Sequence, residues 1–222
     1  MKKRSSSGNI AIGIFILAAL LVILAFFSHS WLVSDYRITG ANFNRLGLWH
    51  HCFRSLPDPN DEYGRRFFVG CRWIFDPFTT GYDQIRGYLV PTFMVLTQFF
   101  YTLTFLAVLA CGIGVLIFFL CCTPHEDRFI PLTFALGLIL VGAGISAALA
   151  TLIFGFWANR DNWMLGHDNN FFGWSFGVAV ASVFALLASG ILFLTEAHIQ
   201  KKKQKYLKES QSRLEMAQET KA

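Results

Sequence analysis

The chain has 222 residues, of which 54% are hydrophobic and 15% are charged, and its formal net charge is +5. So few charges cannot cover a water-soluble globule of this size, which excludes an ordinary soluble domain and indicates an integral membrane protein. The sequence also contains no glycine-rich phosphate loop and no nucleic-acid-binding module, so we expect neither a nucleotide nor a nucleic acid as partner.

Four uncharged apolar stretches are long enough to cross a hydrocarbon core of about 30 Å, which takes roughly 20 helical residues. We expect membrane-spanning helices at about 10–27, 89–120, 130–157 and 171–195. The first stretch follows three basic residues and is also compatible with a cleaved secretory signal. Its 18 apolar residues exceed a usual signal core, and no clear cleavage site follows it, so we expect it to remain attached.

Basic residues flank the first and fourth spans, at 2–4 and 201–208. Because Lys and Arg concentrate on the cytoplasmic side, we expect both termini to be cytoplasmic and the loops 28–88 and 158–170 to face outward. The first loop holds seven Arg and six acidic residues, but loops of about 60 residues largely escape this rule. Residues 1–195 would form one tetraspan domain, and residues 196–222 a basic cytoplasmic tail.

Two cysteines, Cys52 and Cys71, lie in the first outward loop, where an oxidising environment favours a disulfide whose closure contributes about 3 kcal/mol. Two free thiols are the alternative. A zinc site that adds His50 and His51 has suitable residue types, but its spacing matches no usual structural zinc pattern. A bridged cysteine is no nucleophile, and no outward triad is apparent, so we expect no enzyme, metal or cofactor.

The same loop has the pattern of a small antiparallel sheet. Residues 66–75 are aromatic and β-branched, residues 57–64 are rich in turn formers, and residues 47–53 supply the preceding strand. Its aromatic residues offer an adhesive surface, although some must fill the core of the sheet. They are Phe53, Phe67, Phe68, Trp73, Phe75, Phe78 and Tyr82.

The predicted spans contain no Asp, Glu, Lys, Arg or His, and Gln98 is their one strongly polar side chain. A proton relay, ion-coupled transporter or voltage sensor needs ionisable groups at membrane depth, so these classes are excluded. Small residues recur every fourth position on the last span, which favours close helix packing within the chain or a dimer seam. They are Gly173, Gly177, Ala181 and Ala185.

Trp31, the run Gly47-Leu48-Trp49-x-x-Cys52 and Cys71, placed between the first two of four spans, resemble the claudin superfamily. This group includes claudins, peripheral-myelin and epithelial membrane proteins, and calcium-channel gamma subunits. The resemblance implies a left-handed four-helix membrane bundle with a disulfide-pinned extracellular antiparallel sheet. It implies that the Trp and Gly-Leu-Trp residues anchor the sheet on the bundle, and that Cys52 bonds Cys71. Arg86 matches a basic residue of claudins.

Three features of the chain narrow the choice of branch within this superfamily. The spacing between the cysteines exceeds that usual in vertebrate claudins, the last residues lack the Tyr-Val terminus that binds PDZ scaffolds, and no Asn-x-Ser/Thr sequon occurs. The chain is most similar to invertebrate septate-junction claudin-like proteins of the insect Pasiflora type. That resemblance implies an occluding junction at the lateral plasma membrane, with itself or other junctional proteins as partners. An auxiliary channel subunit and an adhesion or trafficking tetraspan remain alternatives.

Three further features of the sequence each allow a functional hypothesis and a simpler alternative. Cys121 and Cys122 adjoin the second span and are candidates for palmitoylation, or simply small residues at a helix end. Trp163, Met164 and Leu165 form an apolar tip in the second loop, which predicts a contact between membranes or packing on the first loop. The basic run 201–205 predicts attraction to anionic lipid, or it only sets the topology.

Overall fold

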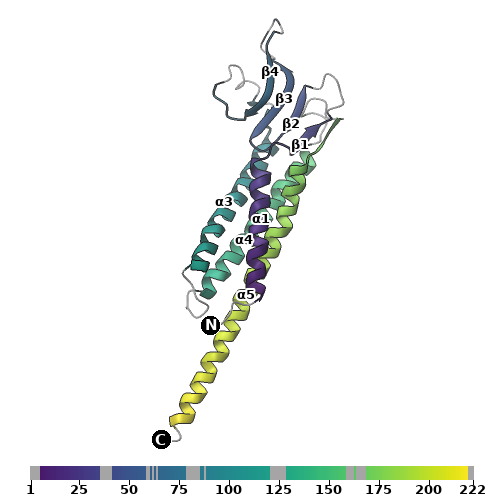
Figure 1. Cartoon of the computed structure of the whole chain (residues 1–222). Coiled ribbons are helices and arrows are strands. Elements are labelled where there is room, and N and C mark those ends of the chain that lie inside the picture. The colour runs from purple at the N-terminus through teal and green to yellow at the C-terminus, as the bar shows by residue number, and fades with distance from the viewer. Residues whose placement is uncertain are drawn as a thin grey trace.

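The computed structural model describes residues 6–35, 42–58, 61, 63, 65–78, 86–87, 89–120, 129–158, 163 and 169–219. Within these residues, four helices are long and apolar enough to cross a membrane, which confirms the predicted tetraspan. They are α1 (Ser6–Phe27), α3 (Thr92–Leu120), α4 (Phe129–Trp157) and α5 (Trp174–Glu219). They run side by side as a bundle that carries a sheet at one end (Figure 1).

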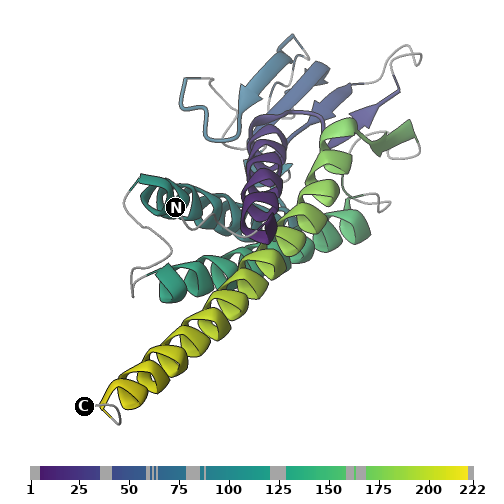
Figure 2. The same cartoon turned by 60° about the horizontal axis from the view of Figure 1, so that its bottom comes forward.

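The last helix is longer than expected. Its 46 residues span roughly 69 Å at about 1.5 Å per residue, more than twice the hydrocarbon thickness of about 30 Å. Figures 1 and 2 show α5 projecting past the other three helices on the side away from the sheet. The boundary expected at residue 195 is therefore a change of composition inside one continuous helix.

Five short strands form the sheet, in the order β4-β3-β2-β1-β5, and every neighbouring pair is antiparallel. They are β1 (Leu32–Ser34), β2 (Phe43–Leu46), β3 (His50–Pro57), β4 (Phe67–Trp73) and β5 (Asn170–Phe172). The sheet predicted around 47–53 and 66–75 is confirmed, with β3 and β4 as its longest strands. β3 begins three residues later than predicted because residues 47–49 form the turn before it.

Glycines bring α4 and α5 into close contact. A Cβ atom on Gly144 would lie 2.7 Å from Leu187 Cδ2, and one on Gly190 would lie 2.8 Å from Val141 Cγ2. Because neither position has room for a methyl group, the two helix backbones approach as closely as the small residues allow.

The small residues predicted to recur along α5 do not all face the interior of the bundle. Gly177 and Ala181 are exposed on the outer face of the bundle, and a Cβ on Gly177 would meet nothing within 4 Å. Ala185 is half-buried against the core, and Gly173 lies before the helix begins. Gly177 and Ala181 therefore do not pack within the chain, and the alternative of a dimer seam stays a prediction for them. The four-residue spacing gives these residues a common face but does not say which way that face points.

Polar side chains join the helices inside the bundle. Because each donor finds a backbone carbonyl on a neighbouring helix, no water is needed to satisfy it. These hydrogen bonds run from Ser146 Oγ to Phe100 O (2.8 Å), from Thr104 Oγ1 to Ala143 O (3.2 Å) and from Ser189 Oγ to Ala11 O (3.0 Å).

A carboxyl group also lies inside the bundle, one residue beyond the predicted end of the fourth span. Glu196 is 1% exposed, and it accepts hydrogen bonds from the Ser7 hydroxyl of α1 and from Gln200 Nε2 (2.8 Å). The predicted span of 171–195 therefore stopped just short of a buried ionisable side chain.

We expect Gly190→Ala and Gly177→Ala to have opposite effects. Alanine favours a helix over glycine by about 0.5–1 kcal/mol, and nothing opposes that gain at position 177. At position 190 the new methyl would lie 2.9 Å from the backbone nitrogen of Val141, and such overpacking costs about 1–3 kcal/mol. Thermal unfolding of the purified protein in detergent should show a lower midpoint for Gly190→Ala only. Equal midpoints for the two variants would contradict this packing.

Candidate functional site

Trp31 joins the end of α1 to the sheet and to the other three helices. Its side chain is completely buried, and its indole Nε1 donates to Ala25 O at 2.8 Å. The indole makes edge-on contacts with one aromatic residue of each remaining helix. These residues are Tyr101 of α3 (ring centroids 5.2 Å apart), Phe154 of α4 (5.1 Å) and Phe176 of α5 (5.8 Å).

The backbone of Trp31 also makes hydrogen bonds in both directions. Its N–H donates to Leu46 O of β2 at 2.7 Å, and its carbonyl accepts from Gly173 N at 2.9 Å. A Cβ on Gly173 would lie 2.1 Å from Ser30 O, so this position tolerates only glycine without movement. The start of α5 is thereby held against the end of α1.

The Gly-Leu-Trp run forms the turn between β2 and β3, on the side of the sheet that meets the bundle. Gly47 N donates to His50 O at 2.9 Å, and a Cβ on Gly47 would lie 2.4 Å from Ser28 O. Leu48 is completely buried. Glycine is required because the turn lies directly on the backbone that follows α1.

The polar side chain of Gln98, in α3, has a role at this turn, which it caps with a hydrogen bond. Its Nε2 donates to Leu48 O at 2.6 Å, and both residues are buried. Sequence inspection singled out Gln98 as the polar side chain of its span but gave it no role. A lone amide in an apolar helix was the available signal, because a buried amide needs a hydrogen-bond partner.

Trp49 and Arg86 meet through a third residue. The Trp49 ring packs on Phe26 of α1 and on Phe75, with centroids 5.7 Å and 6.3 Å apart. The guanidinium of Arg86 lies over the Phe75 ring, 5.8 Å from its centroid. The structure thus brings these two predicted residues together around Phe75.

The disulfide between Cys52 and Cys71 is present and joins directly opposed residues of β3 and β4. Because both sulfurs are bonded, neither thiolate is available for the zinc alternative or for a nucleophile. In the described part of the chain no group of three or more His, Cys, Asp or Glu residues could hold a metal ion. The cross-link pins β4, which has a strand partner on one side only among the described residues.

The predicted aromatic surface divides into core and exposed members. Phe53 and Phe68 are buried in the sheet, and Tyr82 lies outside the described residues. Four others are between 46% and 92% exposed along β4 and the turn after it: Phe67, Trp73, Phe75 and Phe78. Phe67 lies at the start of β4, and Trp73 at its end contacts Phe75 in the turn, with ring centroids 5.4 Å apart. The four exposed residues are called here the β4 aromatic edge.

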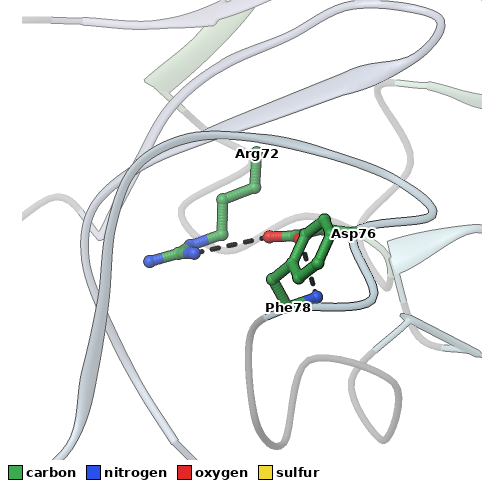
Figure 3. A network of polar contacts seen from close by, with 3 residues as sticks. All are labelled: Arg72, Asp76 and Phe78. Carbon is green, nitrogen blue, oxygen red and sulfur yellow. Dashed lines mark hydrogen bonds and ion pairs between the residues drawn. The ribbon is translucent and has the colours of Figure 1, made fainter.

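The turn that ends this edge is held by Asp76 (Figure 3). One oxygen of its carboxylate lies 3.5 Å from Arg72 Nη1, and the other accepts a hydrogen bond of 2.9 Å from Phe78 N. Asp76 N in turn donates to Trp73 O at 3.0 Å. These contacts order the backbone that presents Phe75 and Phe78, a role that the sequence pattern did not reveal.

Of the other predicted site residues in the loops, the structure describes Trp163. Trp163 is 6% exposed, and its ring packs edge-on against Phe93 of α3 at 4.8 Å. This placement favours packing over a contact between membranes, with Phe93 of α3 as one partner. Met164, Leu165, Cys121 and Cys122 lie outside the described residues.

Comparison with known families identifies a matching model. The model described as "PMP-22/EMP/MP20/Claudin tight junction" matches residues 16–195, which include the sheet, α3, α4 and parts of α1 and α5. No curated protein matches the chain.

We expect Gln98→Leu to destabilise the fold, because it leaves the buried Leu48 carbonyl without its donor. An unsatisfied buried group costs about 1–3 kcal/mol, so the unfolding midpoint in detergent should fall. Thr102→Val is the matched control, since its hydroxyl donates within α3, to Gln98 O at 2.5 Å. Equal losses in the two variants would show that the link between helix and turn has no special weight.

We also expect acid to weaken the sheet. Burial, together with the smaller effect of the nearby His50, lowers the pKa of His51 from 6.5 to about 3. His51 is therefore neutral when folded but takes up a proton on unfolding, so stability falls as the pH drops from about 6.5 towards 3. Unfolding midpoints measured from about pH 7.5 to about pH 5 should decline less steeply in His51→Gln than in the unmodified protein. Parallel declines would exclude His51 as the cause.

Proposed function

Because the chain belongs to the PMP-22/EMP/MP20/claudin family, we propose that it forms or assembles an occluding, septate-type junction. In this role it restricts paracellular diffusion across epithelial or glial barriers. The family consists of structural membrane proteins that lie in the bilayer and interact with other junction proteins. The proposed activity accordingly rests on contacts between proteins and requires no catalysis.

The topology of the proposal has both termini in the cytoplasm. Basic residues precede α1, at 2–4, and follow the apolar part of α5, at 201–208, and such residues concentrate on the cytoplasmic side. The sheet lies at the opposite end of the bundle (Figure 1), so this orientation puts it outside the cell. There it can meet sheets of neighbouring chains and of the opposing membrane.

The β4 aromatic edge is the observation that carries the proposal. An edge strand presents backbone groups that can pair with another chain, and exposed apolar patches mark interaction surfaces. Phe67 is 53% exposed and Phe78 is 92% exposed, while the disulfide and Asp76 hold the strand and its turn in place. Docking would bury these rings without first having to order the backbone.

The charge of the first loop supports a barrier instead of a selective pore. Residues 28–88 carry seven Arg and six acidic residues, so the loop has little net charge with which to favour cations or anions. A surface of this kind restricts passage mainly by steric closure.

Within the family we place the chain with invertebrate septate-junction claudin-like proteins of the insect Pasiflora type. Eighteen residues separate Cys52 from Cys71, and the chain has no Asn-x-Ser/Thr sequon. The structure uses the long interval for β3, β4 and the segment between them.

We expect an epithelium depleted of this chain to leak a small fluorescent dextran, and antibody staining of the intact tissue to label the lateral junction. Re-expressed Phe67→Ser should reach the surface yet fail to restore the barrier, because it removes an exposed ring from the β4 aromatic edge. Phe171→Ser is the matched control: Phe171 is also 53% exposed, but it lies on β5 at the other edge of the sheet.

A tight epithelium after depletion would contradict the proposal. If the chain then altered currents on co-expression with a channel, the auxiliary-subunit hypothesis would replace it. Full rescue by Phe67→Ser would contradict the role of the β4 aromatic edge while leaving the barrier function standing.

A further inference from the structure

A groove of about 530 Å³ lies between α4 and α5, at the end of the bundle away from the sheet. Its volume is within the range of about 300–1,000 Å³ typical of ligand pockets. The wall from α4 consists of Ile130, Pro131 and Phe134, and the wall from α5 of Leu194, Ala197, His198, Lys201 and Gln204. One side is thus purely apolar, whereas the other changes from apolar to basic along the helix.

The lining residues of α5 are ordered by depth. Leu194, His198 and Lys201 are spaced four and three residues apart, so they stand above one another on one helix face. Lys201 is six residues beyond Thr195, where the apolar run ends, and six residues rise about 9 Å. The headgroup layer is roughly 5–8 Å thick on each side of the hydrocarbon core. The α-carbon of Lys201 therefore lies at the outer boundary of the headgroup layer. Because helical side chains tilt toward the N-terminus of their helix, the Lys201 ammonium reaches back to the headgroups, while Leu194 lies at the level of the acyl chains.

We propose that this groove binds one anionic phospholipid of the cytoplasmic leaflet. The phosphate would contact Lys201 and His198, which offer an ammonium and an imidazole N–H, and an acyl chain would lie along Leu194 and Phe134. Phe134 is 50% exposed and supplies the apolar surface for that chain. The assignment to the cytoplasmic leaflet rests on the topology in the proposed function.

The position of the neighbouring lysines separates this site from a general attraction of the tail to the membrane. Lys202 and Lys203 are exposed at nearly the same depth as Lys201, but they do not line the groove. Attraction to an anionic surface acts on each basic residue by its depth alone. A built site instead makes Lys201 more important than its neighbour in the sequence.

The test uses the full chain, purified and reconstituted in nanodiscs that contain phosphatidylcholine with either phosphatidylserine or phosphatidylinositol bisphosphate. Native mass spectrometry after release into detergent counts the lipids retained. Lys201→Gln should lower retention of anionic lipid about ten-fold or more, because it removes a direct hydrogen bond between two charged groups. Lys202→Gln, with the same charge change at nearly the same depth, should leave retention nearly unchanged. Equal thermal unfolding of both variants confirms that they fold.

Three outcomes would overturn the site. Equal losses in Lys201→Gln and Lys202→Gln would show diffuse attraction only, and equal retention of phosphatidylcholine would show that the headgroup is not read. Full displacement by soluble inositol trisphosphate or inorganic phosphate would show a free phosphate site that needs no acyl chain. The nanodiscs have the same composition on both faces, so an error in the proposed orientation or barrier role does not affect the result.

Discussion

The packing of Trp31 is the constraint on which the rest of the structure depends. Its ring touches an aromatic side chain of α3, α4 and α5, while its own backbone continues into β1 and pairs with β2. Buried aromatic rings of this size contribute more surface than other side chains, and edge-on pairs add about 0.5–1.5 kcal/mol beyond that burial. Bundle and sheet therefore share one core, so a change in helix packing is transmitted to the strands.

At the junction between bundle and sheet, some backbone N–H and C=O groups lie outside helices and strands, close to the apolar interior of the membrane. Each such group needs a partner, because water is scarce there and an unpaired group is costly. Gln98 supplies the partner for Leu48 O, and Gly173 supplies the partner for Trp31 O. Gly47 lets the turn lie directly on the end of α1. The Trp and Gly-Leu-Trp residues thus satisfy hydrogen bonds and allow close approach, and the surface that we propose for contacts with partners lies elsewhere.

The two ends of the molecule are specialised for different surroundings. At the sheet end, the disulfide and Asp76 hold apolar rings in an exposed position, an arrangement that is favourable only when a partner covers them. At the other end, α5 leaves the bundle as a basic helix. The groove beside it is apolar toward the bundle and cationic toward the tail. Together they suit a protein that meets other proteins on one side of the membrane and lipid headgroups on the other.

The sequence by itself determined the four spans, the pairing of β3 with β4 and the disulfide, because span length, strand composition and cysteine placement are local signals. It did not determine which face of each helix packs, since lipid and bundle interior are equally apolar and leave no amphipathic pattern. Only the tertiary structure turned Gly177 outward and buried Trp163 on α3. It also decided β1, β2 and β5, whose three or four residues are too short to show a strand period and are ordered by their neighbours.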